Sequence, residues 1–178
     1  MLSVAGIGAA FGRNAGDQFI TGLFIGTNLV AGVVASGVAG IILTNDKLRL
    51  TLLITSLGYL LYLAFKITYA KKKLAFNEKI SAPGLWSGIV LQIVNPKAYA
   101  VSTTLFTGFA FWPENLMIET IIKLLIFNTL WIPVHFTWLH IGITIHKLNL
   151  SAKSQQQINI AMSVSMLLVV GITLMAPT

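Results

Sequence analysis

Long apolar segments without charged residues are the feature that most limits what this chain can fold into. The run from Gln18 to Asn45 contains no Asp, Glu, Lys or Arg and is flanked by Asp17 and Asp46. At about 1.5 Å per residue, a helix of this length can cross a hydrocarbon core roughly 30 Å thick with some tilt. The run therefore predicts a membrane-spanning helix.

Further apolar segments follow along the chain. Leu50–Phe65 extends to about Ala70, because the aliphatic stem of Lys66 can lie along the apolar surface while its amine reaches water. The remaining segments are Gly84–Trp112, which is interrupted at its centre, Leu124–Ile145 and Ile158–Ala176. We therefore expect an all-α fold, a polytopic membrane helix bundle with five main hydrophobic segments.

Composition argues against an ordinary water-soluble domain. The chain of 178 residues is 56% hydrophobic and 10% charged, whereas soluble domains carry about 25% charged residues. It has no cysteine, which excludes disulfides and thiolate metal sites. The net charge of +7 lies between the apolar segments and forms no basic face, so we expect a lipid bilayer and no nucleic acid as partner.

Loop charges give the segments a direction. When the loop of three consecutive lysines is cytoplasmic and each segment crosses once, most basic residues fall on the cytoplasmic side. Basic residues are retained there, so we expect a multi-pass protein of the cell (inner) membrane with its C-terminus outside. The cytoplasmic residues are then Arg13, Lys66, Lys71, Lys72, Lys73, Lys79, Lys147 and Lys153, and those on the far side are Lys47, Arg49 and Lys123.

The interrupted segment contains Asn95-Pro96-Lys97 at its centre. Pro96 has no N–H to offer the Gln92 carbonyl, and its ring clashes with the preceding turn. Asn95 is biased away from helical dihedrals because it precedes proline. The segment is therefore expected to split into two half-helices, which are roughly Gly84–Val94 and Lys97–Phe111.

Such a break at membrane depth indicates a polar cavity. Unpaired backbone survives there only inside protein or beside water, and a cation costs about 2.5–3.5 kcal/mol on insertion scales. Many secondary transporters build substrate sites from discontinuous helices. Lys97 at the start of the second half-helix favours a carboxylate, and freed carbonyls near Gln92 and Asn95 can accept from an ammonium. The alternative is that Pro96 only kinks a packed helix and Lys97 reaches the headgroups.

Three patches in order along nearly the whole chain carry a likeness to a known family. They are Gly12-Arg13-Asn14-Ala15-Gly16 with Gly22 and Gly26, then Gly58-Tyr59-Leu60-Leu61-Tyr62-Leu63, then Asn95-Pro96-Lys97-Ala98 after Gly88. They resemble the lysine exporter (LysE/RhtB) family of amino-acid exporters. The resemblance implies six helices in two inverted three-helix repeats and export of amino acids, usually coupled to the proton gradient.

The sequence departs from that family in two places. Family members carry Pro-Gly-Pro shortly before the Gly-Arg turn, and Met1 falls about where the residues just after that motif would lie. Met1–Phe11 would then be the second half of a broken first helix, matching Lys97–Phe111. Gln92 stands where asparagine is common. The resemblance implies one transporter domain over residues 1–178, with a truncated first repeat (1–70), a basic cytoplasmic loop (71–83) and a second repeat (84–178).

Six residues are expected to bind substrate. Each is polar or shapes the break, and they are Gln92, Asn95, Pro96, Lys97, Asn28 and Asn128. Asn28 is the amide inside the run from Gln18 to Thr44, and Asn128 occupies a comparable depth in the fourth segment. For these two amides, an interhelical hydrogen bond is the alternative role.

Coupling or gating is expected from Arg13, Asp17 and His135. Arg13 and Asp17 are four residues apart on one helical face, and a surface ion pair at the membrane edge is the alternative. His135 and His140 lie ~140° apart around a helix, so they share no face and predict no metal site. Proton relay by one of them remains open.

Small residues indicate close helix packing. Gly22 and Gly26 form one stripe, and Gly32, Ser36 and Gly40 form a ladder of the same spacing. Such stripes let helices approach closely without lipid between them. A role beside a moving pathway is the alternative to packing.

Catalytic signatures are missing from the sequence. It contains no Gly-x-Ser-x-Gly, no paired carboxylates and no phosphate-cradling glycine loop, and its acids lie at or outside segment ends. We therefore expect no enzyme and no cofactor, but an exporter of amino acids or related small metabolites by proton-coupled secondary transport. The alternative is a truncated, non-transporting family member or a helical membrane interaction protein, and a homo-oligomer is left open.

Overall fold

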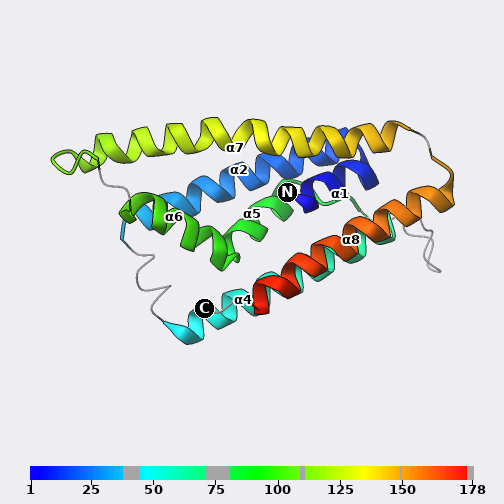
Figure 1. The fold of residues 1–178 in the computed structure, drawn as a ribbon, viewed down its shortest axis with the longest axis horizontal. Coiled ribbons are helices and arrows are strands. Elements are labelled where there is room, and N and C mark those ends of the chain that lie inside the picture. Colours follow the sequence, from blue (N-terminus) through cyan, green and yellow to red (C-terminus); the bar gives the residue numbers. More distant parts are fainter. Residues whose placement is uncertain (38–44, 71–80, 109–110, 149, 176–178) are drawn as a thin grey trace.

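The computed structural model describes residues 1–37, 45–70, 81–108, 111–148 and 150–175, and every regular element within these ranges is a helix (Figure 1). The all-α expectation is confirmed for them. Residues 71–80 of the predicted basic loop, with Lys71, Lys72, Lys73 and Lys79, lie outside the described residues. The helices are α1 (Leu2–Phe11), α2 (Arg13–Ala35), α4 (Asp46–Thr68), α5 (Leu85–Ile93), α6 (Pro96–Gly108), α7 (Leu116–Lys147) and α8 (Ala152–Met175).

Three helices are long and apolar enough to cross a membrane. Among the described residues these are α2, α4 and α7, judged by length and composition. They indicate a membrane protein, since a span of the hydrocarbon core needs about 20 predominantly apolar residues. The number of five spans stays a prediction.

Local chemistry sets several helix ends. The Asn45 side chain accepts a hydrogen bond from the Leu48 amide at 3.1 Å and caps α4, and the Asn115 side chain accepts from the Ile118 amide and caps α7. Gly12, with φ of 81°, separates α1 from α2 in a left-handed conformation that glycine adopts without a steric penalty.

The first long apolar run does not form one helix over its whole length. Helix α2 ends at Ala35, ten residues short of the expected end at Asn45. Ser36 and Gly37 form a turn there, and Gly37 has φ of 81°. A glycine in this conformation commonly ends a helix. The absence of charged residues from the run predicted its apolar character but not where the helix ends.

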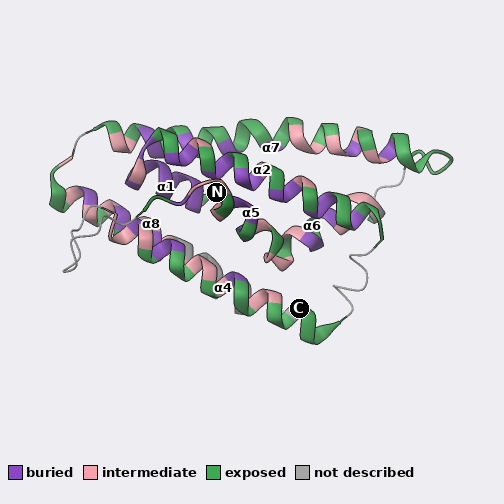
Figure 2. Cartoon of the chain, turned by 180° about the vertical axis from the view of Figure 1, so that it is seen from behind, coloured by how far each residue is buried: buried purple, intermediate pink, exposed green. Residues whose placement is uncertain are grey.

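Helices from the first part of the chain pack mainly against helices from the second part. Helix α2 lies against α5 and α6, α1 lies against α7, and α4 lies against α8 (Figure 1). Figure 2 shows that α1 is largely buried, whereas the outer side of α7 is exposed along much of its length. The main core cluster joins α1, α2, α4 and α7 and includes Val4, Ile7, Phe19, Leu63, Ile67 and Leu139.

Four helix ends with basic residues lie on the same side of the bundle, in agreement with the predicted membrane orientation. The start of α2, the end of α4, the end of α7 and the start of α8 lie at one end of the bundle (Figure 1). These helix ends contain Arg13, Lys66, Lys147 and Lys153, respectively. The arrangement is consistent with the orientation expected from basic residues.

Glycines allow α2 and α5 to touch through their backbones. A Cβ atom on Gly22 would collide with the Leu85 carbonyl oxygen, and one on Gly88 would collide with the Phe19 carbonyl oxygen. The packing role predicted for Gly22 and Gly26 is confirmed, because both face α5. The packing role predicted for the ladder is not observed at Gly32, where an added Cβ would meet no described atom within 4 Å. Ser36 is exposed, and Gly40 lies outside the described residues.

Candidate functional site

The predicted break in the third apolar segment is confirmed. Helix α5 ends at Ile93 and α6 begins at Pro96. The Asn95 side-chain oxygen accepts a hydrogen bond from the Lys97 amide at 3.1 Å. The Tyr99 hydroxyl donates to the Ile93 carbonyl at 3.0 Å. Side chains on both sides of Pro96 therefore replace part of the hydrogen bonding that the helix loses.

One expectation about the break is wrong. The Gln92 carbonyl is not left without a donor, because the Asn95 amide donates to it at 3.2 Å. The Asn95 carbonyl likewise accepts from the Ala98 amide at 3.0 Å. Tighter turns of this kind commonly satisfy the last carbonyls of a helix. The cavity beside the break therefore relies on side chains more than on freed carbonyls.

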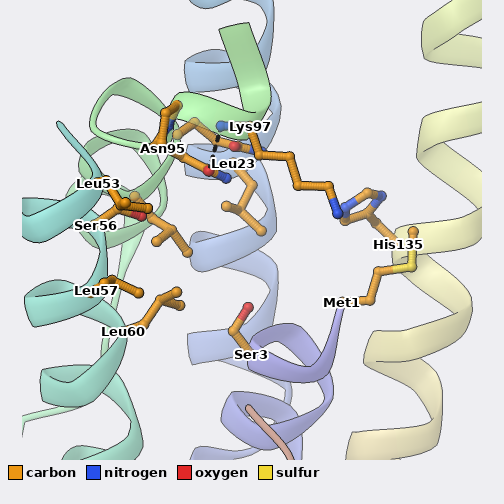
Figure 3. Close-up of a pocket in the computed structure, with 13 residues that line it drawn as sticks. Met1, Ser3, Leu23, Leu53, Ser56, Leu57, Leu60, Asn95, Lys97 and His135 are labelled. Carbon is orange, nitrogen blue, oxygen red and sulfur yellow. Dashed lines mark hydrogen bonds between the residues drawn. The ribbon is translucent and has the colours of Figure 1, made fainter. Parts of the chain in front are cut away.

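A cavity of about 280 Å³ opens beside the break, and we call it the Lys97 cavity (Figure 3). Parts of α1, α2, α4, α5, α6 and α7 contribute to it. Five of the residues predicted from sequence line it together, namely Gln92, Asn95, Pro96, Lys97 and His135. The other lining residues are Met1, Ser3, Leu23, Leu53, Ser56, Leu57, Leu60 and Leu91.

Lys97 is the cationic side chain of this cavity. Its side chain extends from the start of α6 across the cavity toward Met1 and His135 (Figure 3). Among the described lining residues there is no Asp or Glu. The N-terminus of α6 adds a partial positive charge of the same sign, because helix dipoles are positive at that end. The site is therefore electropositive and suited to an anionic group.

Gln92 connects the break to the neighbouring helix. Its side-chain nitrogen donates to the Thr27 hydroxyl of α2 at 2.7 Å. Thr27 is 5% exposed, and the α2–α5 crossing at Gly22 and Gly88 brings the two helices close enough for this bond. The amide oxygen of Gln92 stays available to accept.

His135 occupies the α7 wall of the cavity. Its Nδ1 lies 2.8 Å from the Trp131 carbonyl, and its ring stacks on Trp131 with centroids 3.6 Å apart. A carbonyl only accepts, so Nδ1 carries the proton and Nε2 of the neutral ring is an acceptor. His135 thus has one titratable nitrogen not used by its own helix.

Asn28 and Asn128 bond to each other. Asn128 Nδ2 donates to Asn28 Oδ1 at 2.8 Å, and Asn28 Nδ2 donates to Asn128 Oδ1 at 3.3 Å. The pair joins the middles of α2 and α7, which is the interhelical alternative named above. Neither residue lines the Lys97 cavity, and their role in substrate binding stays a prediction.

Arg13 and Asp17 lie apart from the Lys97 cavity. Arg13 Nε is 3.4 Å from Asp17 Oδ2, and the two side chains are 76% and 43% exposed. They line a separate cavity of about 100 Å³ with His140 and Lys147. The two histidines therefore face different cavities, as their spacing predicts. Coupling by Arg13 and Asp17 stays a prediction.

A buried ion pair was missed by the sequence reading. Glu119 Oε1 lies 2.5 Å from Lys123 Nζ, and each side chain is 4% exposed. Lys123 Nζ also donates to the Phe106 carbonyl at 2.9 Å, and Glu119 Oε2 accepts from the Trp112 amide at 2.7 Å. Lys123, which the loop-charge count placed on the far side of the membrane, is therefore paired and buried, and Glu119 is buried with it. Their spacing of four residues was the available signal.

The described residues contain no group of three or more His, Asp or Glu side chains arranged to hold a metal ion. The chemistry that the Lys97 cavity offers is non-covalent, with one cationic side chain, amide, imidazole and hydroxyl groups, and a leucine-rich wall. No family model, no curated protein and no solved structure matches this chain.

Proposed function

We propose that the protein is a membrane exporter of amino acids or related small metabolites that works by proton-coupled secondary transport. The observation that carries the proposal is the break between α5 and α6, which lies beside a cavity lined by Lys97. Backbone irregularity at membrane depth is tolerated where it is buried in protein or lines a water-filled cavity. A cation there is expensive and is usually retained for function.

The packing pattern supports alternating access between two related halves. The first helix of one half, α1, lies on the middle helix of the other, α7. In return, α5 and α6 lie on α2, and the last helices α4 and α8 lie on each other. This is the exchange that a twofold pseudo-symmetry between two inverted repeats would produce. Transporters built this way rock one unit against the other around a site near the bilayer midplane.

The position of α1 supports its assignment as a second half-helix. It packs on the later part of α7, where Gly8 faces Leu139 and Gly142 faces Ala5. Helix α6 packs in the same way on the later part of α2, where Tyr99 belongs to one core cluster with Val30 and Val34. These contacts support corresponding roles for α1 and α6, which the family resemblance implies for Met1–Phe11 and Lys97–Phe111.

His135 supports coupling to protons. Its Nε2 accepts in the neutral ring, and its ring borders the cavity that contains Lys97. Protonation of Nε2 would add a further positive charge to that cavity and change its affinity for a charged ligand. A proton arriving from one side of the membrane could thus be exchanged for substrate.

Export can be measured in cells that express the chain, from extracellular accumulation of amino acids and relief of amino-acid toxicity. Lys97→Gln and Asn95→Leu are each expected to lower export about tenfold or more, because a charge-assisted hydrogen bond to the ligand is worth about 1.5–3 kcal/mol. Dissipating the proton gradient is expected to stop export by the unmodified protein.

Lys47→Gln is the matched control, since Lys47 is exposed in the first turn of α4 and outside the cavity lining. It should export normally, and all three variants should reach the membrane in equal amounts. Full export by both cavity variants would reject the site. An unmodified chain that inserts and exports none of the amino acids would favour the non-transporting alternative.

A further inference from the structure

The charge balance of the Lys97 cavity limits the ligands that it can hold. Its described lining has the Lys97 ammonium and no acidic side chain. A charge removed from water is costly unless it is paired. A ligand carboxylate gains a partner in Lys97, whereas a second ammonium group on the ligand gains none and lies near a like charge.

Three side chains of the lining bond within the protein and still keep a polar atom for a ligand. Gln92 uses its nitrogen on Thr27, so its oxygen remains as an acceptor. His135 uses Nδ1 on Trp131, so Nε2 remains as another. Asn95 uses its oxygen on the Lys97 amide, so its nitrogen remains as a donor. Two neutral acceptors can bind one α-ammonium group, and the donor can assist Lys97 at the carboxylate.

The opposite wall of the cavity is mostly apolar, with one hydroxyl, that of Ser56 on α4. Its apolar side chains come from α2, α4 and α5, namely Leu23, Leu53, Leu57, Leu60 and Leu91. These side chains can bury an aliphatic group but cannot solvate a charged or strongly polar one. The volume of about 280 Å³ lies at the lower end of ligand pockets, which begin near 300 Å³, so the ligand is small.

We propose that the Lys97 cavity binds small α-amino acids with an uncharged aliphatic side chain and rejects those with a cationic side chain. The inference rests on the proposed function for the place of the site, and it concerns binding, which can be measured without transport. The carboxylate lies at Lys97, the α-ammonium group lies between the Gln92 oxygen and His135 Nε2, and the side chain lies against the leucines.

Equilibrium binding of labelled leucine and labelled lysine to the purified full chain in lipid nanodiscs tests the inference. Leucine is expected to bind about tenfold more tightly than lysine or better. Lys97→Gln is expected to weaken leucine binding by about 30-fold or more, because one partner of a close charge pair is lost. Lys47→Gln should bind leucine normally. Equal affinities, a preference for lysine, or no binding of leucine would overturn the inference.

A pair of substitutions at Leu57 separates charge from shape. Leu57→Asp places a carboxylate in the apolar wall, and Leu57→Asn places a neutral group of the same size there. The aspartate is expected to raise the ratio of lysine to leucine binding about tenfold relative to the asparagine. The same ratio in both variants would show that charge does not select the ligand, against the inference.

Efflux from liposomes that contain the same protein keeps the two proposals apart. Selective leucine binding without leucine efflux would reject export and leave the ligand assignment standing. Efflux of leucine and lysine at equal rates, with equal binding, would leave export standing and reject the ligand assignment.

Discussion

Two ion pairs of the same spacing begin in the first turns of α2 and α7, and they differ in exposure, in distance and in their further partners. Arg13–Asp17 has a 3.4 Å contact between side chains that are 76% and 43% exposed. Glu119–Lys123 has a 2.5 Å contact between side chains that are 4% exposed. The spacing of four residues places each pair on one helical face, and the surroundings decide what the contact is worth.

Helix polarity favours the second pair over the first. Glu119 lies in the first turn of α7, where the helix dipole stabilises a negative charge, and it precedes its lysine. Arg13 opens α2 with a positive charge and precedes its aspartate, which is the weaker order. Lys123 also donates to the Phe106 carbonyl at 2.9 Å, joining the end of α6 to α7. The buried pair therefore holds the α6–α7 connection, whereas the exposed pair holds no connection between helices.

Loss of Lys123 should have the largest effect on stability. Lys123→Met leaves the Glu119 carboxylate without its counter-charge, so the free energy of unfolding is expected to fall by more than any change at the exposed pair. Unfolding by added SDS in mixed micelles, followed by circular dichroism, measures the change. A loss no larger than that of an exposed pair would erase the difference between the two sites.

Removal of both charges of the buried pair should cost less than removal of one. In Glu119→Gln combined with Lys123→Met, no buried charge is left, and the glutamine oxygen can still accept from the Trp112 amide. The double variant is expected to recover most of the stability that Lys123→Met loses, as buried pairs exchanged for neutral groups often do. A double-mutant cycle gives the coupling, and strictly additive losses would contradict the pairing.

The exposed pair should have the smallest effect. Arg13→Gln and Asp17→Asn are each expected to change the free energy of unfolding by about 0.2–1 kcal/mol, because water and salt screen the interaction. Repeating the measurement at high salt should remove even this difference. A change as large as that of Lys123→Met would mean that the small cavity beside Arg13 is structurally essential. Altered export at unchanged stability would instead support the gating role predicted for Arg13 and Asp17.

The break in the third segment was predictable because its cause is covalent. Pro96 lacks an N–H wherever the chain goes, and the residue before it avoids helical dihedrals. The observed ends at Ile93 and Pro96 agree with that expectation. The end of α2 was missed for the opposite reason, since Gly37 permits a left-handed turn without requiring one.

Part of the candidate site could be assigned from sequence and part could not. The interruption between α5 and α6 has four site residues beside it, so predicting its position also predicted theirs. They are Gln92, Asn95, Pro96 and Lys97. Thr27 as partner of Gln92 was not predictable, because the pairing depends on which face of α2 meets α5. The meeting of His135 with Lys97 across the cavity also depends on how α7 is placed against α6.

The sequence by itself determined the helical class, the membrane character of its apolar runs and the position of the broken helix, because hydrophobic length and proline geometry act within a few turns of chain. Only the tertiary structure decided that Asn28 bonds to Asn128, that Glu119 and Lys123 are buried, and that Gly22 and Gly88 touch another backbone. These features depend on contacts between helices far apart in sequence. The same residue types at the same spacing become exposed or buried according to the neighbour that covers them.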